Sequence, residues 1–199
     1  MPRQNLLFFR SNNREKDFHE KEAIRLCLHG DSRAFEGIVE KYRDRVFWIA
    51  YHLVLDYEDA RDITQQSFLN AWKSLGTYDE GKPFGNWISK ISARCAIDFL
   101  RSRKDSEPLE DVALEGFPLE RNLDIRKIFL RIAPALSQRR RTVLVLREIY
   151  GMDVAEIADL LRCTESTVRN LLSQAKESFR KKIKELFPEY GLWSNSRGG

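Results

Sequence analysis

The sequence predicts an all-α protein made of two small helical domains joined by a flexible acidic linker, with a helix-turn-helix in the second domain. Apolar residues recur at helical spacing in both halves, and residues 24–104 show no alternation typical of strands. Between the halves, residues 105–121 combine acidic side chains with Pro and Gly, which interrupt helices. Residues 152–176 carry two helix N-terminal signals separated by a short turn, the arrangement of a helix-turn-helix.

Composition and charge restrict the functional class. Charged residues make up 32% of the 199-residue chain and the net charge is +4, so any nucleic-acid-binding surface must be local. Cys27, Cys95 and Cys163 are widely spaced and lack metal-ligand spacing, which favours reduced thiols in a cytoplasmic protein with no metal or cofactor. The longest apolar run near the start, residues 6–9, is too short for a signal sequence or a membrane span, so no membrane insertion is expected.

The first domain is expected at residues 24–104. Residues 1–23 before it show no sustained period and indicate a mobile extension, or a helix formed only on a partner. From residue 31 to residue 53, apolar side chains follow one helical face over several turns, with Asp31 or Ser32 as the N-cap. This pattern predicts a long helix that faces the core.

A second helix is predicted to run through Trp72, with Phe68, Ala71 and Trp72 facing inward. Its outward side carries a polar stripe at i, i+3 and i+4 spacing, formed by Asp62, Gln65 and Gln66. A solvated face is the default interpretation of such a stripe.

The Gly- and Pro-containing loop at residues 75–87 and the helix after it mix aromatic and cationic side chains. Aromatic rings stack on unpaired bases while cations neutralise phosphate, so this segment is a candidate surface for melted DNA. Taken alone, it would be better interpreted as core aromatics beside solvated cations. The candidate residues are Phe84, Trp87, Lys90, Arg94 and Arg101.

The acidic linker at residues 105–121 separates the two domains. Its acidic stretch, residues 105–120, has sixteen residues and spans up to roughly 50 Å when extended, so the domains can act at separated places. The linker is either a generic spacer or an anionic strand that occupies a channel built for nucleic acid.

The second domain is expected at residues 122–187, followed by a tail at 188–199 that shows no period. One helix ends near Pro134, and another is capped by Ser137 and runs to Tyr150, with Gly151 placed as its C-cap. This domain holds 14 Lys or Arg against 8 Asp or Glu, whereas residues 24–104 hold 13 against 11. The larger basic surplus suits a duplex-binding domain.

The helix-turn-helix has a start signal for each of its helices. Asp153 precedes Glu156 at capping-box spacing, and Thr164 caps the second helix. An ordinary hairpin with one polar side in water is the alternative, but successive caps and a basic extension exceed what a hairpin needs. The second helix and its extension carry side chains that reach base edges and phosphates in a major groove: Thr167, Arg169, Asn170, Ser173, Gln174, Lys176 and Arg180.

Together these segments resemble the extracytoplasmic-function class of bacterial RNA polymerase sigma factors over about residues 24–185. DARDITQQSFLNAW, from Asp59 to Trp72, is similar to the polymerase-binding helix of that family. GKPFGNWISKISARCAIDFLRSRK, from residue 81, resembles its promoter-melting segment. SQRRRTVLVLREIYGMDVAEIADLLRCTESTVRN, from residue 137, resembles the domain that reads the upstream promoter element.

The resemblance implies a transcription initiation factor without catalytic residues, which binds core RNA polymerase and promoter DNA. It also implies an anti-sigma partner and a stress or envelope signal. The loop before the third helix would capture a flipped base of the non-template strand. Polymerase contacts are implied for Asp59, Asp62, Gln65, Gln66 and Asn70.

At four positions the chain departs from the family pattern. Gln66 stands where an acidic residue is usual, Arg94 where Asn is common, Arg162 at the usual turn glycine, and Leu171 at a frequently basic position. The promoter sequence is therefore expected to be this chain's own.

Two other classes compete with this interpretation. A ligand- or phosphorylation-controlled activator would need an α/β sensor domain before the linker, and residues 24–104 lack strand alternation. A DNA-processing enzyme would need a nucleophile or a carboxylate–metal constellation, and none has convincing spacing.

Overall fold

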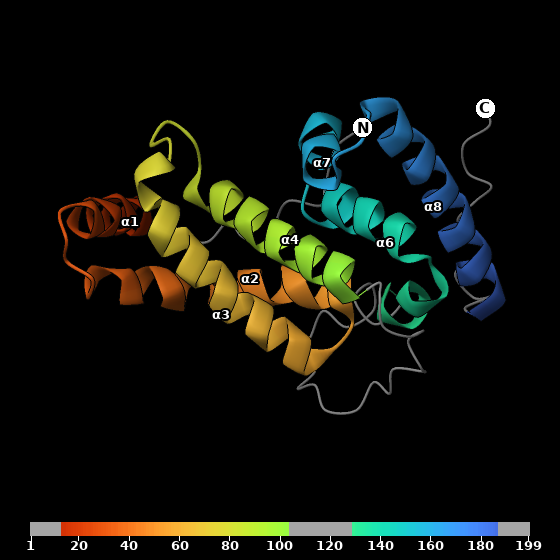
Figure 1. Ribbon diagram of the computed structural model, residues 1–199, viewed down its shortest axis with the longest axis horizontal. Helices are drawn as coiled ribbons and strands as arrows, with labels where there is room; N and C mark the ends of the chain where they lie inside the picture. The colour runs from red at the N-terminus through yellow and green to blue at the C-terminus, as the bar shows by residue number, and fades with distance from the viewer. Residues whose placement is uncertain (1–12, 104–128, 187–199) are drawn as a thin grey trace.

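The computed structural model describes residues 13–103 and 129–186, and every regular element in these ranges is helical (Figure 1). The predicted all-α class is confirmed, and residues 13–103 contain no α/β sensor domain. The first domain comprises α1 (Asn13–Leu28), α2 (Ala34–Val54), α3 (Tyr57–Ser74), a 3₁₀ turn (Leu75–Thr77) and α4 (Phe84–Arg103). The second comprises a 3₁₀ turn (Ala133–Ala135), α6 (Gln138–Leu144), a π-helical turn (Val145–Ile149), α7 (Val154–Leu161) and α8 (Glu165–Leu186). The predicted linker and the tail at 188–199 lie outside the described residues.

α1 begins at Asn13, inside the segment expected to be a mobile extension. Its C-terminal half is packed, because Ile24 and Cys27 are buried in a core shared with α2, α3 and α4. Glu20 accepts a 2.6 Å hydrogen bond from the Tyr42 hydroxyl on α2. Packing against the first domain therefore reaches back at least to Glu20, before the predicted domain start at residue 24.

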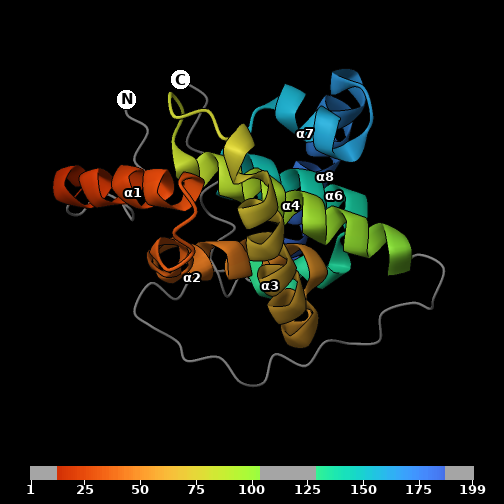
Figure 2. The ribbon, with the colours of Figure 1, turned by 60° about the vertical axis from the view of Figure 1, so that its left-hand side comes forward.

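The helices α2, α3 and α4 pack against one another and form the body of the first domain (Figures 1 and 2). On α2 the predicted inward face is buried, including Val46 and Ile49, which are fully inaccessible. The helix ends at Leu55, which adopts a left-handed conformation with φ of 61°. Asp56 then caps α3 by accepting a 2.9 Å hydrogen bond from the Asp59 backbone N–H. This tight connection fixes the direction of α3.

In the second domain, the helix predicted after Ser137 is present but changes its winding. It begins as α6 and continues through the π-helical turn, and the Tyr150 N–H bonds to the Val145 carbonyl at 3.2 Å. Ser137 occupies the N-cap position without a side-chain hydrogen bond. Gly151 has φ of 69°, a left-handed conformation that suits the predicted C-cap glycine.

The two domains touch. α4 packs against α7 and α2 against α6, and Figure 1 shows α4 as the helix of the first domain nearest to α7. One continuous apolar core includes residues of both domains, and the Phe129 ring lies edge-on to the His52 ring at 5.5 Å. The Tyr150 hydroxyl lies 2.9 Å from His52 Nδ1. None of the described helices is long and apolar enough to cross a bilayer.

Candidate nucleic-acid and polymerase interface

The capping box that starts α7 is formed as the sequence predicted. The Asp153 carboxylate accepts a 2.7 Å hydrogen bond from the Glu156 N–H, and the Glu156 carboxylate accepts a 3.0 Å bond from the Asp153 N–H. Thr164 caps α8, since its hydroxyl accepts a 3.2 Å hydrogen bond from the Thr167 N–H. Ile157 on α7 and Val168 on α8 are fully buried, so the two short helices close on a shared core.

Arg162 takes the place of a turn glycine between α7 and α8. It adopts a left-handed conformation with φ of 53°, and its N–H bonds to the carbonyl of Asp159 at 3.1 Å. This conformation costs a non-glycine residue roughly 1–2 kcal/mol. The turn therefore has a backbone conformation that favours glycine, and Arg162 adopts it at a cost in free energy.

Arg162→Gly is expected to raise the free energy of unfolding by about 0.5–1 kcal/mol, because the relief of strain exceeds the extra entropy of glycine in the unfolded chain. Urea denaturation measures this difference. Arg180→Gly is the matched control, because Arg180 lies inside α8, where glycine lowers stability by about 1 kcal/mol. Equal signs for the two variants would contradict the strain at Arg162.

α8 presents much of the predicted reading surface to solvent. Thr167, Arg169, Asn170 and Ser173 are exposed, and Arg169 is paired with Glu165 one turn earlier at 2.5 Å. Such an exposed pair is weak and leaves Arg169 available to a base edge.

The Gln174 side chain, predicted to contact a base edge, is already hydrogen-bonded within the protein. Its carbonyl accepts a 2.9 Å hydrogen bond from Arg140 of α6, and its amide donates to Asn170 at 3.1 Å. Lys176 pairs with Glu148 at 2.8 Å, whereas Arg180 is exposed further along α8. Arg140 was missed because a contact between α6 and α8 leaves no local pattern in the sequence.

Phe84 is buried, whereas the sequence-based assignment to base stacking expected an accessible ring. It is 1% exposed, and its ring packs against Tyr42 at 5.4 Å, Tyr78 at 5.0 Å and Trp87 at 5.1 Å between centroids. Trp87 is half-buried and is the ring of this cluster that α4 brings towards the surface. Phe84 therefore packs against the buried side of Trp87 and holds that ring in place.

Three of the four cationic side chains of α4 contact the second domain, whereas Arg103 pairs with Asp59 of α3. Lys90 pairs with Glu156 of α7 at 2.5 Å, and Arg94 pairs with Asp159 at 3.1 Å. Arg101 donates to the carbonyl of Leu160, the next residue along α7, at 3.2 Å. The structure thus brings together the cations expected to bind melted DNA, but against α7.

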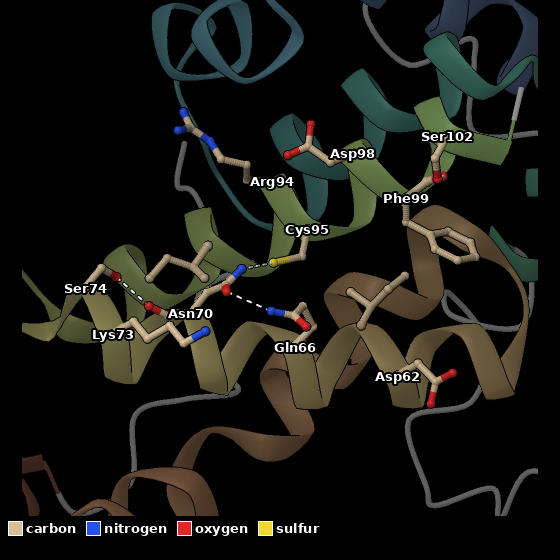
Figure 3. Close-up of a pocket in the computed structure, with 12 residues that line it drawn as sticks. Asp62, Gln66, Asn70, Lys73, Ser74, Arg94, Cys95, Asp98, Phe99 and Ser102 are labelled. Atoms are coloured by element: carbon tan, nitrogen blue, oxygen red, sulfur yellow. Dashed lines mark hydrogen bonds between the residues drawn. The ribbon is translucent and has the colours of Figure 1, made fainter.

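The polar stripe of α3 divides between two sides of the helix. Asp62, Gln66 and Asn70 line an open pocket of about 730 Å³ between α3 and α4 (Figure 3). The Gln66 side-chain amide donates to Asn70 Oδ1 at 2.8 Å, and the Asn70 side-chain amide donates to Cys95 Sγ at 3.2 Å. Across this pocket Figure 3 places Arg94, on α4.

Gln65 instead lines a second groove of about 720 Å³ between α2 and α3. Leu69 and Trp72 lie in the same groove and are 48% and 37% exposed. Trp72 was expected to face inward, but its ring packs edge-on to Phe35 at 5.1 Å and leaves one side accessible. Asp62 lines both the groove and the pocket. Leu69 and Trp72 were not predicted to lie at the surface, because large apolar side chains usually indicate core positions.

Asp59, the first implied polymerase contact, is partly buried. Burial, together with the neighbouring Asp56, raises the pKa of the Asp59 carboxyl, although Arg103 opposes the shift by pairing with it. Asp59 therefore links α3 to the end of α4 within the domain. Among the described residues, no cluster of three or more His, Cys, Asp or Glu is arranged to hold a metal ion.

These observations define a helical nucleic-acid-binding protein with a helix-turn-helix domain and a second domain that carries an aromatic and cationic helix. Residues 38–106 match the family model of sigma-70 region 2, and residues 126–179 match that of sigma-70 region 4. The chain belongs to the sigma-70 family of RNA polymerase sigma factors, in its extracytoplasmic-function class. The expected resemblance is thereby confirmed.

Two relatives match this chain over most of their own length. The chain is 25% identical to the ECF RNA polymerase sigma factor SigW of Bacillus subtilis, a match that covers 83% of this chain and 97% of SigW. It is 26% identical to the RNA polymerase sigma-H factor of Pseudomonas aeruginosa, over 85% of this chain and 96% of that protein.

Two solved structures share the fold. The sigma factor RpoE of Bartonella quintana, solved with the anti-sigma factor NepR, matches with a TM-score of 0.62 and 18% identity, over 75% of this chain and 96% of RpoE. CnrH, solved with the cytosolic domain of CnrY, matches with a TM-score of 0.55 and 20% identity, over 84% of this chain and 99% of CnrH.

Proposed function

We propose that this protein is an alternative initiation factor that binds core RNA polymerase and directs it to specific promoters in the cytoplasm. The observation that carries the proposal is the presence, in one chain, of a region 2 match and a region 4 match. The chain acts without catalytic residues of its own, because the polymerase supplies the chemistry of RNA synthesis.

Polymerase docks on α3 and the groove beside it. Gln65 and Asp62 supply hydrogen-bonding groups at the groove, while Leu69 and Trp72 supply exposed apolar surface. Interfaces of this kind gain most of their energy from a few apolar or aromatic anchors surrounded by polar groups. The groove combines apolar anchors, Leu69 and Trp72, with polar groups beside them, as such interfaces do.

Promoter melting uses α4. Trp87 stacks on an unpaired base, and Lys90 and Arg94 neutralise phosphates of the displaced strand. Unstacking a base costs a few kcal/mol, whereas stacking on an aromatic ring returns about 1–3 kcal/mol. Because the two nearly cancel, melting requires the polymerase to hold the complex.

α8 reads the upstream promoter element as duplex DNA. Arg169, Asn170 and Ser173 contact base edges in the major groove, and Arg180 and the following lysines position the helix on phosphates. The short side chains of Asn170 and Ser173 allow α8 to approach the bases closely.

An anti-sigma factor is the proposed regulatory partner. Region 2 and region 4 sigma factors with this fold have been solved with such proteins, as with RpoE and NepR. A comparable partner would release this chain in response to a stress or envelope signal.

Co-purification with core RNA polymerase tests the central proposal. The full chain is expected to bind core polymerase in the absence of DNA and to support run-off transcription from a subset of a promoter library. Failure to bind core polymerase would refute the proposed function.

Arg169→Ala is expected to reduce discrimination at one base pair of the upstream element by about 1–3 kcal/mol, the range of a good bidentate contact. Competition binding with single-base variants of the element measures it. Lys184→Ala is the control, since Lys184 lies exposed near the end of α8 and its loss should weaken binding uniformly across sequences. A uniform loss in Arg169→Ala would instead assign Arg169 to phosphate.

A further inference from the structure

A chain of hydrogen bonds connects α6 to the base-reading side of α8. The Arg140 guanidinium of α6 donates to Gln174 Oε1 through Nη2 at 2.9 Å and through Nε at 3.3 Å. Gln174 Nε2 in turn donates to Asn170 Oδ1 at 3.1 Å, one turn earlier on α8. Arg140 and Gln174 are half-buried, whereas Asn170 is exposed. The chain therefore runs from the contact between α6 and α8 to a side chain that faces solvent.

The arginine sets the direction of these hydrogen bonds. A guanidinium carries only donors, so the Gln174 amide has to turn its oxygen towards Arg140. The Gln174 nitrogen then faces Asn170, whose side-chain oxygen accepts the bond, and the Asn170 nitrogen is directed away. Reversing either amide would bring two donors or two acceptors together. Both amides therefore have only N–H donors left for another molecule on their free side.

The surroundings of this chain hold it in place. Within the described part of the protein, the hydrogen bonds of Arg140 go to Gln174 alone. Asn170 and Gln174 lie at i, i+4 spacing and so share one side of α8. On the other side, Leu172 and Ala175 are buried and fix the rotation of the helix about its axis. The donor side of the two amides is therefore presented in a defined direction.

We propose that Arg140 is a positioning residue for promoter reading, which makes Asn170 and Gln174 act as donors and so selects a base that presents only acceptors in the major groove. This inference rests on the proposed function, because it assumes that α8 lies in that groove. Guanine presents O6 and N7 and thymine presents O4, whereas adenine and cytosine each present an amino donor. Guanine fits best, because its two acceptors can take one N–H from each amide.

An unconstrained asparagine would prefer a different base. It pairs with adenine by accepting from N6 and donating to N7, which requires its oxygen and its nitrogen to face the base together. The Asn170 oxygen already faces Gln174, so this bidentate pairing is lost. Arg140 thereby changes the base that Asn170 selects, although Arg140 itself need not touch DNA.

A phosphate contact is the competing role for Arg140, and it has different consequences. A phosphate contact strengthens binding to every sequence alike and adds to the salt dependence of binding. Positioning instead changes the relative affinities of the bases at one position of the element. The base profile and the salt dependence therefore separate the two roles.

The holoenzyme formed from core RNA polymerase and the full chain is first used to select its upstream element from a randomised duplex library. Competition binding then compares all bases at each position, and Asn170→Ala identifies the position that Asn170 reads. At that position the unmodified chain is expected to prefer guanine or thymine over adenine and cytosine by about five- to tenfold.

Arg140→Met removes the donor and keeps a long side chain that suits a helix. It is expected to reduce the preference to within about twofold, because both amides can then reverse. Arg140→Lys, which retains a head group with donors only, should restore most of the preference. Arg139→Met removes the same charge from the exposed neighbouring residue of α6 and should leave the base profile unchanged.

Gln174→Glu reverses the polarity of the chain. A carboxylate offers acceptors on both sides, so it still binds Arg140 but makes Asn170 turn its nitrogen inward and its oxygen towards the DNA. The added negative charge lowers affinity for every sequence. The relative preference at this position is nevertheless expected to move towards adenine and cytosine by about fivefold or more.

The outcomes separate the inference from the proposed function. Selection of an element without a preference for guanine or thymine at the position of Asn170, or an unchanged profile in Arg140→Met and Gln174→Glu, would overturn the inference alone. A uniform loss of affinity in Arg140→Met, with a smaller salt dependence and the same profile, would assign Arg140 to phosphate and overturn it as well. Failure of the holoenzyme to select any element would refute the proposed function, and the inference with it.

Discussion

Phe84→Ala is expected to lower the free energy of unfolding of the first domain by about 3–5 kcal/mol, the range for removing a buried aromatic ring. The Phe84 side chain is 1% exposed at the centre of a cluster with Tyr42, Tyr78 and Trp87. Its removal leaves a cavity beneath the loop that precedes α4. Urea denaturation followed by tryptophan fluorescence measures the loss.

Trp87→Ala is the informative comparison, because Trp87 is half-buried and lies at the edge of the same cluster. It is expected to cost less stability and to impair open-complex formation, seen by permanganate footprinting, while duplex binding by α8 persists. Phe84→Leu, which keeps most of the apolar volume, should retain both stability and melting. Loss of melting in a stable Phe84→Leu variant would show that Phe84 contacts the base directly.

The different burial of Phe84 and Trp87 could not be predicted from the sequence. Both are aromatic residues beside cations, and spacing places them within one turn of α4. Their depth is decided by the path of the preceding loop, which brings Tyr78 over both rings at 5.0 and 5.5 Å. No local pattern encodes that path.

Features that depend on neighbours three or four residues apart were predictable. The capping box of Asp153 and Glu156 and the cap at Thr164 are local devices, and the structure has both. Contacts between distant segments were not predictable, and these include the pairs of Lys90 and Arg94 with α7. The sequence indicated two separable domains but gave no sign that they contact each other.

The apolar surface of the groove between α2 and α3 was also not predictable from the sequence. Leu69 and Trp72 have the residue types of a core position, yet they remain 48% and 37% exposed beside Gln65. A single exposed leucine needs no explanation, whereas adjacent apolar side chains in a groove with polar groups indicate a binding site. In this family fold, the partner proposed for that groove is core polymerase.

Leu69→Ala is accordingly expected to weaken binding to core polymerase by about 2 kcal/mol, or roughly thirtyfold in Kd, as for an interface anchor. Its own stability should change little, because nearly half of the side chain is already in water. Titration of core polymerase with labelled protein, in the absence of DNA, measures the affinity.

Leu26→Ala supplies the matched control for that titration. Leu26 is 42% exposed on α1 and does not line the groove, so the substitution removes the same number of atoms from a comparable surface site. It should leave polymerase affinity within about twofold of the unmodified chain, since surface changes outside an interface seldom exceed ~0.5 kcal/mol. Equal losses in Leu69→Ala and Leu26→Ala would indicate a general effect of exposed leucines. A loss confined to Leu69→Ala would place the polymerase against the groove between α2 and α3, which adjoins the pocket facing α4 at Asp62.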